Sequence, residues 1–306
     1  MGVLFIFIDG LGLGPDDREI NPLAAASTRW FRLAGSLPAP GVDGRVVVAT
    51  DATLGVPGLP QSATGQTALL TGKNAPFLAG RHINGYCTRR LAELLEAHSL
   101  FGRLRAAGRR AAFANAYTPR FFQDKALLRF PSVTTVAQRK AGMALRTLED
   151  LARGEALHQE LTNTLLRAQG YDLPLLSPAQ AGARLAALAA NYDFTMFEFF
   201  QTDLCGHAQD FPRALRLLED LDGFLTGVLD GTDLRRDLVV VGSDHGNLED
   251  LSRKTHTANP VPTMAWGAGA HPFASRIRTI ADLAPAILDH LGVAPAGALA
   301  NPPEND

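Results

Sequence analysis

The chain has 306 residues, of which 46% are hydrophobic and 20% are charged, and this composition excludes disordered and fibrous architectures. The length fits one large globular domain or a domain that carries an insertion. The formal net charge is −2, so no overall charge attracts the chain to nucleic acid or to an anionic membrane. Two cysteines, Cys87 and Cys205, are too few for a disulfide framework and are compatible with a reducing compartment.

The sequence contains no segment that resembles a signal peptide or a membrane span. The apolar run at residues 3–8 ends at Asp9, and no basic region precedes it. No apolar run approaches the roughly 20 residues that a bilayer-spanning helix needs. We therefore expect a soluble, cytoplasmic protein with neither a nucleic-acid nor a membrane partner.

Short apolar runs alternate with stretches of helical periodicity along most of the chain. The runs, which predict β-strands, lie at residues 3–8, 45–49, 111–115, 194–200, 238–241 and 263–266. Their nearly unbroken apolarity indicates parallel strands that are covered on both faces. Helices are predicted at residues 88–107, 178–190 and 212–229. This alternation predicts an open α/β sheet with mostly parallel strands.

Residues 118–182 interrupt the alternation and predict a small cap that is inserted into the sheet domain. The segment contains the sequence Arg-Phe-Phe at residues 120–122, a Ser/Thr cluster at residues 132–135, and a helical stretch near residues 144–167. We expect a catalytic core formed by residues 1–117 and 183–306. The tail at residues 301–306 is rich in Pro, Asn and acidic residues and is expected to be loose.

Three aspartates follow predicted strands from distant parts of the chain. Asp9, Asp203 and Asp244 each lie at or near the carboxyl end of an apolar run. Ligands of open α/β proteins bind at this edge of the sheet. A single aspartate there is ordinarily a helix cap or a turn residue. Three at one edge, together with histidines that follow Asp203 and Asp244, instead favour a metal site.

The histidines strengthen this interpretation. His207 follows Asp203 by four residues, His245 is adjacent to Asp244, and His256 begins a Thr- and Pro-containing loop. Imidazole and carboxylate ligands together suit Zn²⁺, Mn²⁺ or Fe²⁺ better than Ca²⁺, which prefers oxygen ligands.

A candidate nucleophile lies in the segment 60–73, where small hydroxyl residues precede a helix. A serine at this position, such as Ser62, is ordinarily a helix N-cap. Beside divalent cations the same hydroxyl becomes a nucleophile, and the free amides of the helix start help to hold a phosphate.

Five motifs in order resemble the alkaline phosphatase superfamily, and most closely its branch of cofactor-independent phosphoglycerate mutases and phosphopentomutases. They are Phe-Ile-Asp-Gly-Leu at 7–11, Ser-x-x-Gly at 62–65, Asp-x-x-Gly-His at 203–207, Ser-Asp-His-Gly-Asn at 243–247 and His-Thr-x-Asn-Pro-Val-Pro at 256–262. The resemblance covers both ends of the chain but not the middle. It implies a three-layer α/β/α sandwich with a mostly parallel sheet, an alkaline phosphatase-like core and a small cap.

The resemblance also implies a dinuclear metal centre that holds two divalent ions, with Mn²⁺ or Zn²⁺ expected. One ion would be held by Asp203, His207 and His256, and the other by Asp9, Asp244, His245 and the hydroxyl of Ser62. Ser62 would attack phosphorus and form a phosphoserine, with Thr64 as the alternative nucleophile. Further candidates for contacts to the substrate are Lys73, Arg81, His82 and Asn84.

Two departures from the mutases bear on the reaction. Gln66 stands where they have a histidine after Ser-x-x-Gly, and the predicted cap is much smaller than their second domain. A small lid excludes water poorly, which favours a phosphomonoester hydrolase acting on a small phosphorylated metabolite. A phosphomutase of the phosphoglycerate or phosphopentose type remains the alternative, with basic cap residues Arg120, Lys125, Arg139 and Lys140 binding the anion. A third, less favoured hypothesis is a metal-binding protein without turnover. The sequence makes no prediction of the oligomeric state.

Overall fold

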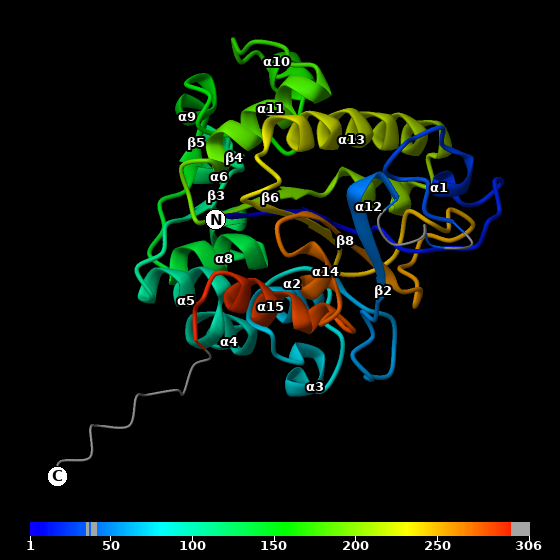
Figure 1. The fold of residues 1–306 in the computed structure, drawn as a ribbon, viewed down its shortest axis with the longest axis horizontal. Coiled ribbons are helices and arrows are strands. Elements are labelled where there is room, and N and C mark those ends of the chain that lie inside the picture. Colours follow the sequence, from blue (N-terminus) through cyan, green and yellow to red (C-terminus); the bar gives the residue numbers. More distant parts are fainter. Residues whose placement is uncertain (35–36, 38–41, 295–306) are drawn as a thin grey trace.

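The computed structural model describes residues 1–34, 37 and 42–294, and its centre is a twisted sheet with helices on both faces (Figure 1). Among the described residues, the main sheet has six strands in the order β2-β8-β7-β1-β6-β3. Their bounds are β1 Val3–Ile8, β2 Arg45–Thr50, β3 Ala111–Phe113, β6 Phe194–Phe199, β7 Leu238–Gly242 and β8 Val261–Gly267. Each apolar run singled out in the sequence supplies one of these strands, and the predicted α/β fold is confirmed.

The sheet is parallel in its middle and antiparallel at one side. Strand β1 pairs parallel with β6 and with β7, and β3 pairs parallel with β6. Strand β8 runs antiparallel to both β7 and β2, so the prediction of parallel strands at residues 45–49 and 263–266 is wrong. The physical reason is that unbroken apolarity reports burial on both faces, which β8 has, and carries no information about strand direction.

Alternate side chains of β1 enter two separate cores, one on each face of the sheet. Phe5 and Phe7 pack with helices α2, α4, α5 and α15, whereas Leu4, Ile6 and Ile8 pack with α11 and α13. These helices span Ser62–Thr71 (α2), Arg89–His98 (α4), Leu100–Ala106 (α5), Leu283–His290 (α15), Pro178–Ala189 (α11) and Phe211–Gly231 (α13). Figure 1 shows the resulting three layers, as predicted.

The single helix predicted over residues 88–107 is two helices in the structure. Ser99 ends α4 and caps α5, with its Oγ accepting a hydrogen bond from the Gly102 N–H at 3.2 Å. The shorter elements are α1 Pro22–Ala25, α3 Ala75–Ala79, α12 Gln201–Ala208, α14 Ala270–Ala274, and the 3-10 helices Val42–Gly44 and Ile280–Asp282.

Residues 118–182 divide between the main core and a small cluster of their own. Their elements are α6 Pro119–Gln123, α7 Lys125–Arg129, α8 Val133–Lys140, β5 Arg146–Thr147, α9 Leu148–Ala152, α10 Thr164–Ala168 and the start of α11, while β5 pairs with β4 Ala116–Tyr117. Val133 and Ala137 of α8 join the core that contains α2, α4 and α5. Leu148, Leu151 and Leu166 form a separate cluster. The boundaries of a cap therefore stay a prediction.

The continuous helical stretch expected near residues 144–167 is not present. A two-residue strand, a short helix and turns occupy this stretch before α10 begins. Leu161 and Asn163 have positive φ angles of 67° and 64°, which a helix cannot accommodate. The predicted loose tail, residues 301–306, lies outside the described residues. Within the part of the chain described here, no helix has the length and apolarity that crossing a bilayer requires.

Helices α11 and α13 approach each other closely because glycines lie at their contact. A Cβ on Gly182 would fall 2.0 Å from the carbonyl oxygen of Phe224, and one on Gly227 would fall 2.1 Å from that of Ala179. No side chain fits in that space, so the two helices meet backbone to backbone. This contact covers the face of the sheet against which α11 packs.

Gly227→Ala is expected to lower the free energy of unfolding by about 2 kcal/mol, because overpacking against a rigid backbone outweighs the roughly 1 kcal/mol that alanine gains in a helix. Urea unfolding measures this change. Gly223→Ala, one turn earlier in α13, is the matched control: its Cβ would meet Pro178 Cβ at 3.3 Å, and we expect a change within about 1 kcal/mol. Equal effects of the two variants would contradict the close-contact explanation.

Candidate metal centre and active site

Three adjacent parallel strands deliver the predicted ligands to one edge of the sheet. Asp9 directly follows β1, and Asp244 and His245 follow β7. Strand β6 leads into α12, which carries Asp203 and His207. The register pairs Ile8 with Phe199 and Phe7 with Gly242, so the three strand ends lie level. His256 comes from the loop before β8, and the structure brings all of these residues together.

The first group consists of Asp9, Asp244, His245 and Ser62. His245 Nε2 lies 3.3 Å from Asp9 Oδ1, 3.5 Å from Asp244 Oδ2 and 3.0 Å from Ser62 Oγ. Asp244 and His245 are completely buried. Among the described residues, Asp9 Oδ1 and Asp244 Oδ2 find no hydrogen-bond donor, although such buried oxygens ordinarily have one. These orphaned carboxylate oxygens are what a bound cation would satisfy.

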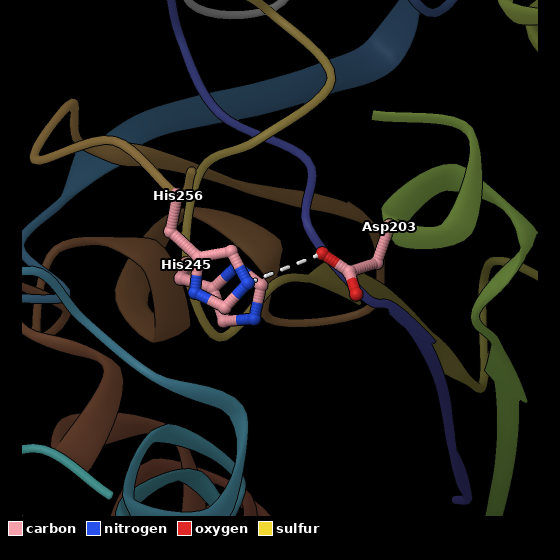
Figure 2. Close-up of side chains that lie close together, drawn as sticks. All are labelled: Asp203, His245 and His256. Atoms are coloured by element: carbon pink, nitrogen blue, oxygen red, sulfur yellow. Dashed lines mark ion pairs between the residues drawn. The ribbon is translucent and has the colours of Figure 1, made fainter. Parts of the chain in front are cut away.

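The second group consists of Asp203, His207 and His256. Asp203 Oδ2 lies 3.4 Å from His207 Nε2, and its Oδ1 lies 3.5 Å from His256 Nε2. Figure 2 shows Asp203 pointing at the stacked rings of His245 and His256, whose centroids are 3.7 Å apart. His245 thus lies between the two groups and is within ligand distance of both. How the ligands divide between two ions stays a prediction.

The orientation of two imidazoles indicates a cation between them. The Nδ1–H of His207 donates to Lys254 O at 2.7 Å, and that of His256 donates to Pro60 O at 2.9 Å. Each neutral ring then carries a lone pair on Nε2, and the two Nε2 atoms face each other at 3.2 Å. Backbone bonds that fix the tautomer in this way are typical of metal-ligating histidines. The donor set therefore fits a divalent metal.

The ionisable groups of the cluster have strongly shifted pKa values. Burial and the Asp9 carboxylate raise the pKa of Asp244 well above its usual range. Burial by itself lowers the pKa of His245, but the carboxylates of Asp244 and Asp9 outweigh it and raise the pKa to about 10. Burial and the charge of His245 lower the pKa of His256 to about 4. Without metal, a proton on His245 balances part of the carboxylate charge.

Ser62 is the first residue of α2 and faces this cluster, while Thr64 is used structurally. Thr64 is fully buried, its Oγ1 donates to Gln61 O at 3.2 Å and accepts from the Ile83 N–H at 3.1 Å. Gly65 lies against the backbone of the loop that carries Asp244, since a Cβ at Gly65 would fall 2.9 Å from Asp244 O. The glycine of Ser-x-x-Gly therefore allows α2 to bring the Ser62 hydroxyl to the ligands.

Gln66 and Glu249 hold the cluster in place, and sequence analysis assigned a positioning role to neither. Gln66 Nε2 donates to Asp9 Oδ2 at 3.1 Å, which leaves Oδ1 directed at His245. Glu249 is fully buried and accepts from the Gly12 and Asn247 N–H groups at 3.1 and 2.8 Å, from Asn259 Nδ2 at 3.1 Å and from the Thr257 hydroxyl. Asn247 in turn donates to Asp203 Oδ1 at 2.7 Å.

The predicted substrate-binding residues are not gathered at the cluster. A cavity of about 710 Å³ opens beside it and is lined by Asp9, Ser62, Gln66 and Asp203. Of the four candidates, Asn84 lines this cavity, while Lys73, Arg81 and His82 do not. Lys73 follows the C-terminal end of α2, a helix of about 15 Å, so it lies far from Ser62. His82 Nε2 instead lies 3.2 Å from Val56 O.

The sequence of the C-terminal part matches a known superfamily. Residues 176–295 match the Metalloenzyme superfamily, and this segment contains Asp203, His207, Asp244, His245 and His256. The chain is 32% identical over 134 residues to the 2,3-bisphosphoglycerate-independent phosphoglycerate mutase of Paracoccus denitrificans and 32% identical over 141 residues to that of Desulforudis audaxviator. The predicted resemblance is confirmed. These matches cover 40% and 44% of the chain, which spans about a quarter of the length of these relatives.

Solved structures resemble the whole fold. The alkaline phosphatase from the Antarctic bacterium TAB5 superposes with a TM-score of 0.57 at 13% identity, covering 96% of this chain and 98% of that chain. A phosphoglycerate mutase from Leishmania mexicana superposes with a TM-score of 0.50 at 13% identity, covering 97% and 96%. At these identities the likeness establishes the fold, and the predicted alkaline phosphatase-like core is confirmed.

Metal affinity is expected to fall about tenfold per pH unit as the pH falls from 8.5 to 7. Because the folded pKa of His245 is about 10, its proton is present throughout this window and must leave before the ring can bind a metal. The same proton stabilises the metal-free fold below pH about 6.5, and this contribution is lost as the pH rises through 10. Calorimetric titration with Mn²⁺ in buffers of different ionisation enthalpy counts the protons released. Affinity that is independent of pH in this window would contradict the assignment.

Glu249→Gln is expected to lower the free energy of unfolding by about 3 kcal/mol, because an amide replaces an acceptor oxygen among buried donors. Metal affinity should fall about 10- to 100-fold, since Asn247 no longer fixes Asp203. Urea unfolding and metal titration measure the two effects. Glu219→Gln, which removes an exposed charge from α13, is the control and should change neither. Unaltered metal affinity in Glu249→Gln would show that Glu249 does not help to position the metal ligands.

Proposed function

We propose that this protein is a dinuclear, metal-dependent phosphoryl-transfer enzyme that acts through a phosphoserine at Ser62. The observation that carries the proposal is the Ser62 hydroxyl, which lies 3.0 Å from His245 Nε2 among orphaned carboxylate oxygens and lines a cavity large enough for a substrate. The similarity to phosphoglycerate mutases and the alkaline phosphatase fold support the same reaction class.

Two divalent ions, Mn²⁺ or Zn²⁺, would be bound by Asp9, Asp244, His245 and Ser62 and by Asp203, His207 and His256. Bound there, they would lower the pKa of the Ser62 hydroxyl and neutralise charge on the phosphoryl oxygens. Gln66 fixes the Asp9 carboxylate, and Ser62 begins α2, where a helix N-terminus favours an anion such as a phosphate. Thr64, with both of its hydrogen bonds inside the fold, leaves Ser62 as the nucleophile.

The reaction has two displacement steps. In the first, Ser62 Oγ forms a bond to phosphorus, the ester P–O bond breaks, and the leaving alcohol takes up a proton. In the second, water attacks the phosphoserine, inorganic phosphate leaves, and the serine hydroxyl is restored. The rim of the cavity includes exposed side chains, among them Tyr86, Phe130 and Leu204, so water reaches the site. We therefore propose a phosphomonoester hydrolase acting on a small phosphorylated metabolite.

A phosphomutase is the second candidate, because the most similar sequences named above are mutases. The basic residues expected to serve it do not line the cavity. Arg120 and Lys125 are exposed, Lys140 Nζ pairs with Glu96 Oε2 at 2.7 Å, and the Arg139 guanidinium lies 5.6 Å from the centre of the Phe121 ring. This arrangement favours hydrolysis over mutase chemistry.

Ser62→Ala is expected to reduce phosphate release by at least about 10³-fold, because the covalent intermediate cannot form. Release of inorganic phosphate is measured with metal-stripped protein refilled with Mn²⁺ or Zn²⁺. Thr64→Ser, which keeps a hydroxyl at the alternative position, is the control and should retain activity within a few fold. Fragment mass spectrometry of quenched wild-type enzyme should place the phosphoryl group on Ser62.

Three outcomes separate the hypotheses. Free phosphate that requires both metal and Ser62 establishes the hydrolase. An isomerised ester without net phosphate release establishes the mutase. Full activity in Ser62→Ala, or bound metal with no phosphoserine and no turnover, refutes the proposed mechanism.

A further inference from the structure

The wall of the cavity beside Ser62 has an unusual composition for a site that handles anions. Its apolar and aromatic members come from several helices, strands and loops and include Tyr86, Tyr117, Phe121, Leu127, Phe130 and Leu204. No lysine or arginine lines the cavity in the part of the chain that the structure describes. Beyond the metal ligands, the wall therefore offers apolar surface and neutral polar groups.

The aromatic rings of the wall pack in two pairs, each formed by separate segments of the chain. The rings of Tyr117 and Phe121 are 4.6 Å apart, and the Tyr86 ring in the loop before α4 lies 5.2 Å from that of Phe130 after α7. The Tyr117 hydroxyl is engaged within the fold by Thr135 Oγ1 and Gln138 Nε2, both at 2.9 Å. This tyrosine thus presents its ring rather than a free polar group.

Exposed apolar side chains concentrate at the mouth of this cavity. Tyr86, Phe130 and Leu204 are 59%, 44% and 48% exposed, and Leu127 is 39% exposed. Large apolar side chains gathered at one exposed place ordinarily mark a binding site. Because these side chains line the same cavity as Ser62, they are placed to contact the part of a substrate that is attached to the phosphoryl group.

The remaining ionisable side chains of the wall, apart from the proposed metal ligands and the tyrosines, are His158 and Glu198, and both lie against other protein groups. The His158 ring has Glu160 Oε1 3.5 Å from its Nδ1. Glu198 is an acid at the end of β6, and its Oε2 accepts from the Thr134 hydroxyl at 2.7 Å. A second carboxylate or phosphate on a substrate would therefore enter an apolar surface without a partner charge, which is costly.

We propose that the enzyme selects phosphate monoesters of uncharged, apolar alcohols, of aromatic or branched aliphatic type, and discriminates against phosphoglycerates and other esters with a second anionic group. This inference rests on the proposed function and names its substrate class. The metal centre recognises the phosphoryl group, and the aromatic wall recognises the alcohol. The proposed substrate class differs from phosphoglycerate, after which the mutase relatives are named.

The test compares monoesters whose alcohols differ in apolar surface but little in acidity. The kcat/KM for 2-phenylethyl phosphate should exceed that for ethyl phosphate by about 30-fold, since burying a phenyl group contributes about 2 kcal/mol. It should exceed that for 3-phosphoglycerate by at least about 100-fold. Equal or higher kcat/KM for 3-phosphoglycerate overturns the inference.

Variants locate the selectivity on the wall. Phe121→Ala and Phe130→Ala should each lower kcat/KM for 2-phenylethyl phosphate about 10-fold and leave that for ethyl phosphate within twofold. Phe77→Ala is the matched control, because Phe77 is 71% exposed on α3 and does not line the cavity. Equal losses on both esters in the wall variants overturn the inference.

A binding measurement keeps this inference distinct from the proposed function. Calorimetry on metal-loaded wild-type protein compares 2-phenylethylphosphonate, which is not hydrolysed, with 3-phosphonopropionate. Tighter binding of the phenyl compound by about 10-fold or more supports the apolar wall even if no ester is turned over, in which case the proposed function alone fails. Tighter binding of the carboxylated compound overturns the inference whether or not phosphate is released.

Discussion

Three aspartates that meet at one edge of the sheet impose the main constraint on this structure. Asp9, Asp203 and Asp244 all lie within 3.5 Å of an imidazole nitrogen, and Asp244 is fully buried. Carboxylates packed this closely repel one another strongly where little water screens them. A proton on His245 offsets part of that repulsion, and divalent cations offset it more completely. Charge balance therefore links the stability of this edge to metal binding.

The surrounding fold is organised to tolerate this concentration of charge. The strands that carry it lie in the middle of the sheet, where both faces are covered by helices. The second oxygen of Asp9 and one oxygen of Asp203 accept amide hydrogen bonds from Gln66 and Asn247. Glu249 fixes the loops that bear Gly12, Asn247 and Asn259. Each of these contacts restricts a carboxylate to one orientation, so the remaining oxygens converge on the imidazoles.

Sequence reasoning found the parts of the site that are encoded locally. Asp9 and Asp244 follow apolar strands directly, and His207 follows Asp203 at a spacing that places both on one side of a helix. Gln66 was missed as a positioning residue because its partner Asp9 is 57 residues away in the sequence. Glu249 was missed because its link to Gly12 spans 237 residues and its nearer partners, Asn247, Thr257 and Asn259, lie in loops whose shape only the folded chain defines. A faint signal existed for Gln66, which lies four residues after Ser62 and therefore on the same face of α2.

The wrong predictions about the fold also concern features that depend on contacts between distant segments or on backbone conformation. The direction of β8 depends on which neighbour it pairs with, whereas its apolar composition depends on burial. The helix expected over residues 144–167 was inferred from periodicity, but backbone conformations at Leu161 and Asn163 break it. The place of a cavity could be predicted from the strand ends, but the residues of its wall could not. Tyr86 and Phe130 come from segments 44 residues apart whose contact only the folded chain defines.

Most of the proposed metal ligands and the aromatic wall come from different parts of the chain, although Asp9 and Ser62 lie before residue 176 as the wall does. This division limits which functional features can be inferred from the relatives. The segment that matches the Metalloenzyme superfamily begins at residue 176 and carries five of the proposed metal ligands. Tyr86, Tyr117, Phe121 and Phe130, which shape the wall, all lie before it. Similarity in the matched segment therefore supports the chemistry at phosphorus and carries no information about the alcohol. Since no lysine or arginine lines the wall in the described residues, we expect it to hold an anionic intermediate poorly while a substrate reorients, which is the reason for proposing water as the acceptor.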